Sequence, residues 1–290
     1  MPAFTTEFFR PSLLGNARNL TFEDVLTRIM ALNLRQRIRA GDDPAVILTL
    51  SRNHSEYSGE AARIRMEDLP SIIDATTGSR HELNVANNEG LGEEIYFLYD
   101  AGLNVIAVQV KGHFRPGALA HLIGDLANID VDFQVILRED AFQRFQNLDL
   151  ITKINFTLAR PQQIRGLAPS VMGAIHEIDE FNGVSAKIEV NVGRERNITL
   201  NRNSVSRLLG ERNGIGESLK ELSITGTTHR LGELEGRTHV DVVDFIKDRL
   251  LERSEVERRG RGKTLDPDGC RMALRRAIST HEEYLRTYRG

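Results

Sequence analysis

The sequence predicts an α+β protein with a mixed or antiparallel sheet at its core and a second, smaller α+β unit. Between residues 94 and 212, period-two apolar segments alternate with segments whose apolar residues recur every 3.6 positions. The first two predicted strands are separated by a short loop, which only an antiparallel pair allows. The later strands have one apolar and one polar face, as in a sheet covered by helices on one side.

The first predicted elements are a hairpin, a helix and a strand. Residues 95–99 and 103–110 are apolar on both faces, which predicts strands inside a sheet. We expect Asp100-Ala101-Gly102 to form a three-residue loop that Gly102 closes with a positive φ. Pro116 opens a predicted helix that reaches Leu126, and a strand is expected over 131–137. The polar segment 53–88 is expected to form connections at the edge of this unit, with one strand at 61–66.

A second strand–helix–strand unit is predicted over 154–158, 167–178 and 184–192. It is followed by a helix that includes Val205, by a short strand at 222–224 and by a return linker at 232–236. The apolar spacing over 240–250 is compatible with a helix, although 250–257 fits a strand equally well. A last helix is predicted after Asp266 as its N-cap, with Pro267 in the first turn.

These elements suggest two domains. Residues 1–147 together with 237–290 are expected to form the main α+β domain. Residues 148–236 are expected to form the smaller unit, which would serve in dimerisation because its sheet leaves a face or an edge uncovered.

Composition is that of a folded protein in a reducing compartment. The chain has 290 residues, a net charge of −3, 40% hydrophobic residues and a single cysteine, Cys270, which excludes an internal disulfide and favours the cytoplasm. No run reaches the roughly 18 apolar residues of a membrane span. Residues 1–10 lack the pattern of a signal peptide, so we expect no membrane insertion.

Two basic segments are the candidate binding residues. Arginines, hydroxyls and amides near a helix N-terminus are suited to sequence-independent contacts with phosphate. The alternative is that the arginines of the first segment are solvated or pair with Glu195 and Glu211, and the residues alone favour it. The first segment contains Arg194, Arg196, Arg202 and Arg207, and the second contains Arg258, Arg259, Arg261 and Lys263.

The order of elements from Glu94 to Arg212, including 131–138, 148–157 and 187–192, resembles the RexA-like phage-exclusion family of lambdoid prophages. The resemblance covers about 40% of the chain, and no catalytic motif anchors it. It implies a cytoplasmic homodimer that contacts DNA without sequence preference, acts in phage exclusion and has a possible membrane-protein partner. It assigns no individual binding residue, but it favours the phosphate-binding interpretation of the arginines. The chain has no Trp and few aromatic residues for stacking on single-stranded bases, so we expect contacts with duplex DNA.

Motifs for cofactors and catalysis are incomplete. Gly260–Thr264 would need a glycine where Glu257 stands to be a phosphate loop, and Gly214-Ile215-Gly216 lacks the third glycine of a dinucleotide site. No histidine pair has the spacing of a metal site. Cys270 lies near a helix start, which can lower the pKa of a thiol, but it has no identifiable partner. We therefore expect no cofactor, no metal and no catalytic residue.

Two alternative functions remain open. A metal-dependent nuclease needs clustered carboxylates and a lysine. Asp179, Glu180, Lys187 and Glu189 lie close in sequence, but Lys187 precedes Glu189, the reverse of the common order, so a solvated strand face is favoured. The other alternative is a protein-binding regulator without DNA activity.

Overall fold

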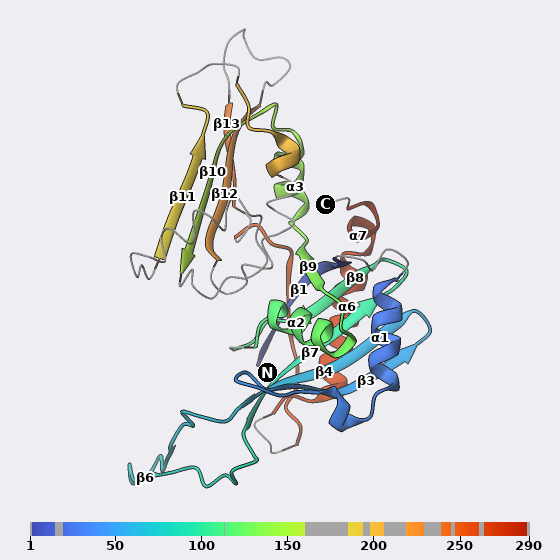
Figure 1. The fold of residues 1–290 in the computed structure, drawn as a ribbon, viewed down its shortest axis with the longest axis vertical. Coiled ribbons are helices and arrows are strands. Elements are labelled where there is room, and N and C mark those ends of the chain that lie inside the picture. Colours follow the sequence, from blue (N-terminus) through green and yellow to red (C-terminus); the bar gives the residue numbers. More distant parts are fainter. Residues whose placement is uncertain are drawn as a thin grey trace. The chain divides into compact units, whose positions relative to one another are not determined.

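A computed structural model describes residues 2–14, 20–112, 114–159, 185–193, 198–205, 219–228, 239–244, 247–260 and 264–288. The predicted α+β class is confirmed (Figure 1). The chain forms two compact units, the first made of Met1–Val131 with Glu252–Arg286 and the second of Asp132–Leu251 with Thr287–Gly290. The boundaries expected from the sequence, at 148 and 236, both lie inside the second unit.

The first unit is built on one sheet with the strand order β14-β1-β8-β7-β4-β3-β2. Neighbours from β1 to β2 are antiparallel. A separate small hairpin pairs β5 (Ile72–Ile73) with β6 (Arg80–His81). An eighth strand, β9 (Val131–Val135), pairs with β1 outside this order. The other strands of the large sheet are β1 (Ala3–Leu13), β2 (Ile38–Arg39), β3 (Ala45–Asn53), β4 (Glu56–Arg65), β7 (Leu91–Asp100), β8 (Val105–Gln109) and β14 (Leu251–Glu255).

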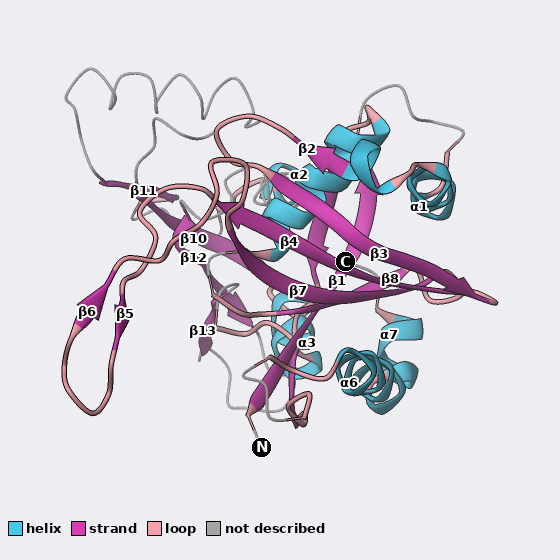
Figure 2. Cartoon of the chain, turned by 90° about the horizontal axis from the view of Figure 1, so that it is seen from below, coloured by secondary structure: helices cyan, strands magenta, loops and turns pink. Residues whose placement is uncertain are grey.

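Helices cover both faces of this sheet (Figure 2). On one face α1 (Phe22–Ala31) and α2 (Pro116–Ala127) pack together, and the hydroxyls of Thr27 in α1 and Tyr57 in β4 are 3.0 Å apart. On the other face α6 (Pro267–Thr280) packs on β7, β8 and β1 and is followed by α7 (Glu282–Thr287). There Phe8 meets the ring of His281 edge-on, at 5.5 Å between centroids. The short 3-10 helix η1 (Leu34–Arg37) leads into β2.

The predicted hairpin is confirmed as β7 and β8, but its loop is different. Asp100 pairs with Val105, so the loop has the four residues 101–104. The Asp100 Oδ1 accepts hydrogen bonds from the backbone N–H groups of Gly102 (2.8 Å) and Leu103 (3.1 Å). The positive φ falls on Asn104, at 51°, and not on Gly102. The aspartate side chain thus turns the backbone, and an asparagine tolerates the left-handed conformation that the glycine was expected to adopt.

The segment expected to form edge connections contains a strand in the interior of the sheet. The strand β4 lies between β3 and β7. The strand expected at 61–66 forms the second half of β4, whereas the small or polar residues 58–60 hid its first half from the hydrophobic pattern. Gly59 is needed there because a Cβ at this position would overlap the ring of Phe97 on β7. The interior position of β4 corrects the sequence-based expectation.

Both predicted helices with proline in the first turn are confirmed. The helix α2 begins at Pro116, and its C-cap Asn128 is left-handed with φ 53°. The helix α6 begins at Pro267, and the Asp266 side chain accepts a hydrogen bond of 2.8 Å from the backbone N–H of Gly269. Leu285 is buried in the separate helix α7 that follows.

The second unit contains an antiparallel sheet with the order β11-β10-β12-β13. Ile154 pairs with Val190 on one side and Ile224 on the other, and Ile224 pairs with Val243. The helix predicted over 167–178 and the linker at 232–236 lie outside the described residues. The elements are β9 (Val131–Val135), α3 (Glu139–Gln146), β10 (Leu150–Ala159), β11 (Ser185–Asn191), β12 (Leu219–Thr228) and β13 (His239–Asp244).

The prediction of a helix over 240–250 is wrong. Residues 239–244 form β13, which pairs with β12 from Ser223↔Asp244 to Thr228↔His239. The spacing of Val240 and Val243 suits a helix, but β-branched residues favour a strand once a partner is present. The alternative strand over 250–257 is confirmed as β14.

Candidate functional site

Five of the eight candidate binding residues, Arg194, Arg196, Arg207, Arg261 and Lys263, lie outside the described residues. Of the other three, Arg202 donates hydrogen bonds to backbone carbonyl groups of the protein. Its guanidinium donates Nη1 to the carbonyl oxygen of Phe145 (3.5 Å) and Nη2 to that of Leu148. Both carbonyls belong to the last turn of α3 or follow it, where a cation is favoured by the helix dipole. Arg202 therefore stabilises the end of α3.

Arg258 and Arg259 lie on a loop with a fixed stem. Arg258 forms an antiparallel bridge with Leu265, and the Arg259 N–H donates to the carbonyl oxygen of Thr264 at 3.0 Å. Below them the Asp266 N–H donates to the carbonyl oxygen of Glu257 at 2.9 Å. Both arginines are exposed, and neither side chain hydrogen-bonds or pairs with any residue in the described ranges. Their guanidinium groups are thus presented to solvent on an ordered base.

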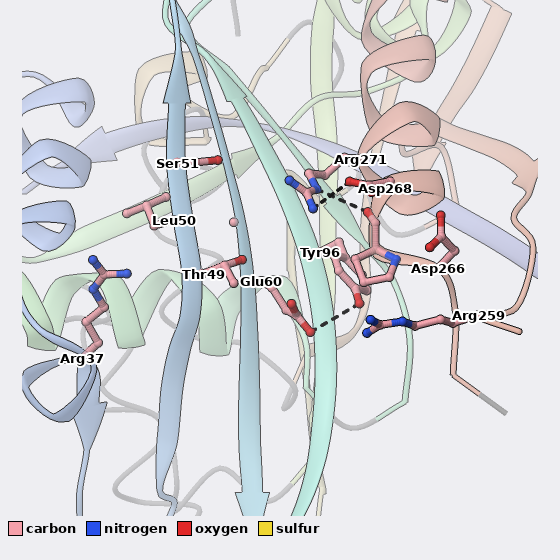
Figure 3. A pocket seen from close by; sticks show the side chains of 12 residues that line it. Arg37, Thr49, Leu50, Ser51, Glu60, Tyr96, Arg259, Asp266, Asp268 and Arg271 are labelled. Atoms are coloured by element: carbon pink, nitrogen blue, oxygen red, sulfur yellow. Dashed lines mark hydrogen bonds and ion pairs between the residues drawn. The ribbon is translucent and has the colours of Figure 1, made fainter. Parts of the chain in front are cut away.

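A cleft of about 560 Å³ lies on the α6 side of the first unit's sheet (Figure 3). Residues of β3, β4 and β7 line it from the sheet, and the loop before α6 and the first turns of α6 line it from the other side. Arg37 of η1 and Arg259 also contribute. The lining side chains are mostly polar or charged, unlike those of an ordinary apolar pocket. The lining residues are Arg37, Thr49, Leu50, Ser51, Gly59, Glu60, Tyr96, Arg259, Asp266, Pro267, Asp268 and Arg271.

Glu60 and Tyr96 form the centre of the sheet side of this cleft. They are register partners on β4 and β7, and the Tyr96 hydroxyl donates to Glu60 Oε1 at 3.3 Å. Burial raises the pKa of Glu60, and the nearby charge of Glu94 raises it further. Burial and the charge of Glu60 raise the pKa of Tyr96, so its hydroxyl keeps its proton and remains a donor.

Most other charged side chains of the cleft already form hydrogen bonds or ion pairs within the protein. Asp266 caps α6, and Arg271 pairs with Asp268 at 2.9 Å. Arg37 donates to the carbonyl oxygens of Leu32 (2.9 Å) and Met30 (2.8 Å) at the end of α1. Of the cleft residues, sequence reasoning singled out Arg259 as a binding candidate. The lining segments are distant in sequence, so no local pattern indicates that they meet.

The residues considered for a nuclease are not assembled in the described structure. Asp179 and Glu180 lie outside the described residues. Glu189 pairs with Lys153 of the neighbouring strand at 2.9 Å, and this hydrogen bond lowers the pKa of Glu189. Within the described ranges, no group of three or more His, Cys, Asp or Glu side chains is arranged to hold a metal ion.

Cys270 does not have the environment of a nucleophile. Its side chain is buried in α6, and burial together with the charge of Asp266 raises the pKa of the thiol to about 12. The lowering of this pKa that a helix start can cause is therefore not found. His281 is engaged elsewhere, with its Nε2 2.8 Å from Glu252 Oε2.

In the described part of the chain, no helix combines the length and the apolar character that crossing a membrane requires. The chain matches DUF6731, a family of unknown function, over residues 20–270. It belongs to this family. The part shared with DUF6731 extends from the start of α1 to the first turn of α6 and includes every cleft residue except Arg271. No curated protein matches the chain.

Proposed function

We propose that this DUF6731 protein binds duplex DNA without sequence preference, as a homodimer. The observation that carries the proposal is the loop 258–263. Its two described arginines have exposed guanidinium groups that contact no partner among the described residues, and its sequence adds Arg261 and Lys263. The acidic residues Glu257 and Asp266 lie at the stem, where Asp266 is used as a helix cap, so the charged residues of the loop are all basic.

A loop of this kind suits phosphate better than bases. Guanidinium groups form paired hydrogen bonds with phosphate oxygens, and such contacts carry no sequence information. The stem bonds of Arg259 and Asp266 fix the base of the loop, which lowers the entropy lost when the guanidinium groups bind. Four cationic contacts would give a log–log salt slope of about −3.6, from about 0.9 for each phosphate.

The loop replaces the first arginine segment as the leading candidate. Arg202 was expected to bind phosphate, but both of its described donor contacts are to backbone carbonyls. Arg194, Arg196 and Arg207 lie outside the described residues and remain predicted contributors. A site in the loop 258–263 does not require them.

Homodimerisation is proposed through the sheet of the second unit. Among the described strands, β13 ends this sheet with β12 as its one neighbour. Its Val240 and Val242 are 60% and 50% exposed, and a second chain could cover them. A dimer would carry two basic loops and gain affinity through effective concentration. The roles in phage exclusion and beside a membrane partner are supported only by the RexA-like resemblance, and a cytoplasmic location is supported also by the single cysteine.

The test is a titration of two unrelated DNA duplexes with the full chain. Binding is measured by fluorescence anisotropy at several salt concentrations. We expect equal affinities for the two sequences. Replacing Arg258 and Arg259 together by glutamine should weaken binding and reduce the salt slope by about 1.8, because two phosphate contacts are lost. The matched control replaces the exposed Arg28 and Arg253, which removes the same charge elsewhere. Equal slopes for the two double variants would place the site outside this loop.

A further inference from the structure

We propose that the cleft between the sheet and α6 binds a small zwitterion, an amino acid or short peptide, with its ammonium group at Glu60 and its carboxylate at Arg259. The cleft volume of about 560 Å³ lies within the roughly 300–1,000 Å³ of small-molecule sites. The proposal goes beyond DNA binding and does not depend on it.

Two opposite charges face the cleft without an ion-pair partner among the described residues. Within the described residues, neither Glu60 nor Arg259 has an oppositely charged side chain within 4.0 Å. They do not pair with each other either, although both line the same cleft. Figure 3 shows Arg259 extending from its loop toward the side where Glu60 and Tyr96 lie. A ligand with a positive and a negative end can bridge the two groups.

Glu60 and Arg259 both keep hydrogen-bonding capacity that a ligand can use. The Tyr96 hydroxyl occupies one oxygen of Glu60, and the other oxygen is available to accept from an ammonium group. Burial and the charge of Glu94 raise the pKa of Glu60 more than the Tyr96 hydrogen bond and the charge of Arg271 lower it, and a bound ammonium group would add a compensating cation. Arg259 offers the planar set of N–H donors that matches a carboxylate. The hydroxyls of Thr49 and Ser51 provide further contacts for a peptide group.

The lining of the cleft disfavours other classes of ligand. Arg37, Arg259 and Arg271 balance Glu60, Asp266 and Asp268, so a ligand with a single net charge would leave one cleft charge uncompensated and partly desolvated. Tyr96 is the one aromatic residue of the lining and is only 5% exposed, which leaves little surface for stacking a base. The charge balance and the polar floor therefore fit a zwitterion best.

The test uses isothermal titration calorimetry of the full chain with three probes. They are alanyl-alanine, its N-acetyl form, which lacks the ammonium group, and its C-terminal amide, which lacks the carboxylate. We expect alanyl-alanine to bind and each capped form to bind at least about tenfold more weakly, since each loses one charge-assisted hydrogen bond. Equal binding of the three probes, or no heat with alanyl-alanine at millimolar concentrations, would overturn the proposal.

Two variants assign the ends of the ligand. Glu60→Gln should abolish the preference for the free ammonium group and keep the preference for the carboxylate, and Arg259→Gln should do the reverse. The matched controls, Glu255→Gln and Arg253→Gln on the exposed side of β14, should bind all three probes like the wild type. If each cleft variant lowered the affinity for all probes equally, the assigned orientation would be wrong. Glu60→Gln should leave the salt slope for DNA unchanged, so the two proposals can fail separately.

Discussion

The guanidinium of Arg202 lies 5.7 Å from the centre of the Phe145 ring, and its Nη1 donates to the carbonyl oxygen of the same residue. A single side chain thus combines a cation–π contact with a cap on the end of α3. Arg202→Ala should lower the free energy of unfolding by about 1–3 kcal/mol, because partly buried carbonyls lose a charged donor. Urea unfolding measures this loss.

The DNA titration tells this role apart from phosphate binding. Arg202→Ala should change the salt slope less than the double substitution of Arg258 and Arg259. A slope reduced by about 0.9 with unchanged stability would instead make Arg202 a phosphate ligand.

Cys270 should be unreactive in the folded protein. Its raised pKa, about 12, leaves almost no thiolate near neutral pH, and the thiol is also buried. A thiol-specific reagent at pH 8 should therefore modify the chain only after urea is added. Rapid modification of the native protein, with no loss of folded structure, would contradict the buried position.

The raised pKa of Cys270 also predicts that the protein loses stability at alkaline pH. The unfolded thiol has the lower pKa, near 9.0, so the unfolded chain releases its proton first. The contribution of Cys270 to stability is complete below pH 9 and declines as the pH rises from about 9 toward 12. Cys270→Ala should be less sensitive than the wild type to pH in this window, as measured by urea unfolding. An equal pH dependence would assign the alkaline loss to other groups.

Gly59→Ala should destabilise the first unit, because its Cβ would overlap the Phe97 ring in the middle of the sheet. Overpacking of this kind typically costs about 1–3 kcal/mol. The control is Gly117→Ala in α2, where a Cβ meets no atom within 4 Å and alanine is the better helix former. Thermal unfolding should show opposite shifts for the two variants. A smaller side chain at 97, as in Phe97→Leu, should partly rescue Gly59→Ala.

The elements found from the sequence are those whose local pattern and tertiary setting agree. The strands β7 and β8 carry bulky apolar residues on both faces, and β10 and β12 carry them at alternate positions. The helices α2 and α6 begin with prolines that suit a first helical turn. The strand β4 was misjudged because its packing partner Phe97 supplies the volume that its own small residues lack. The strand β13 was misjudged because its valines fit both periods, and the choice is made by pairing with β12.

The candidate site was less predictable than the fold. Arg202 and Arg259 are both arginines in basic segments, yet one caps a helix and the other is exposed. The difference depends on the carbonyl groups near each of them, which a sequence does not reveal. The cleft likewise depends on Glu60 and Tyr96 becoming register partners although they are 36 positions apart in the sequence.

The protein should be a homodimer whose interface includes the sheet of the second unit. Light scattering should report twice the chain mass of 32.6 kDa. Val242 on β13 and Val190 on β11 are 50% and 45% exposed and lie on the two outer strands of this sheet. A lysine in place of one of them should give a monomer, because a charge on an edge strand opposes pairing with another chain. That monomer should also bind DNA less tightly, since the avidity of two basic loops is lost.

Ile73→Lys on the β5–β6 hairpin of the first unit is the control. The Ile73 side chain is 66% exposed, and this variant should remain dimeric. A wild-type chain that is monomeric at tens of micromolar would rule out both the interface and the bivalent mode of binding.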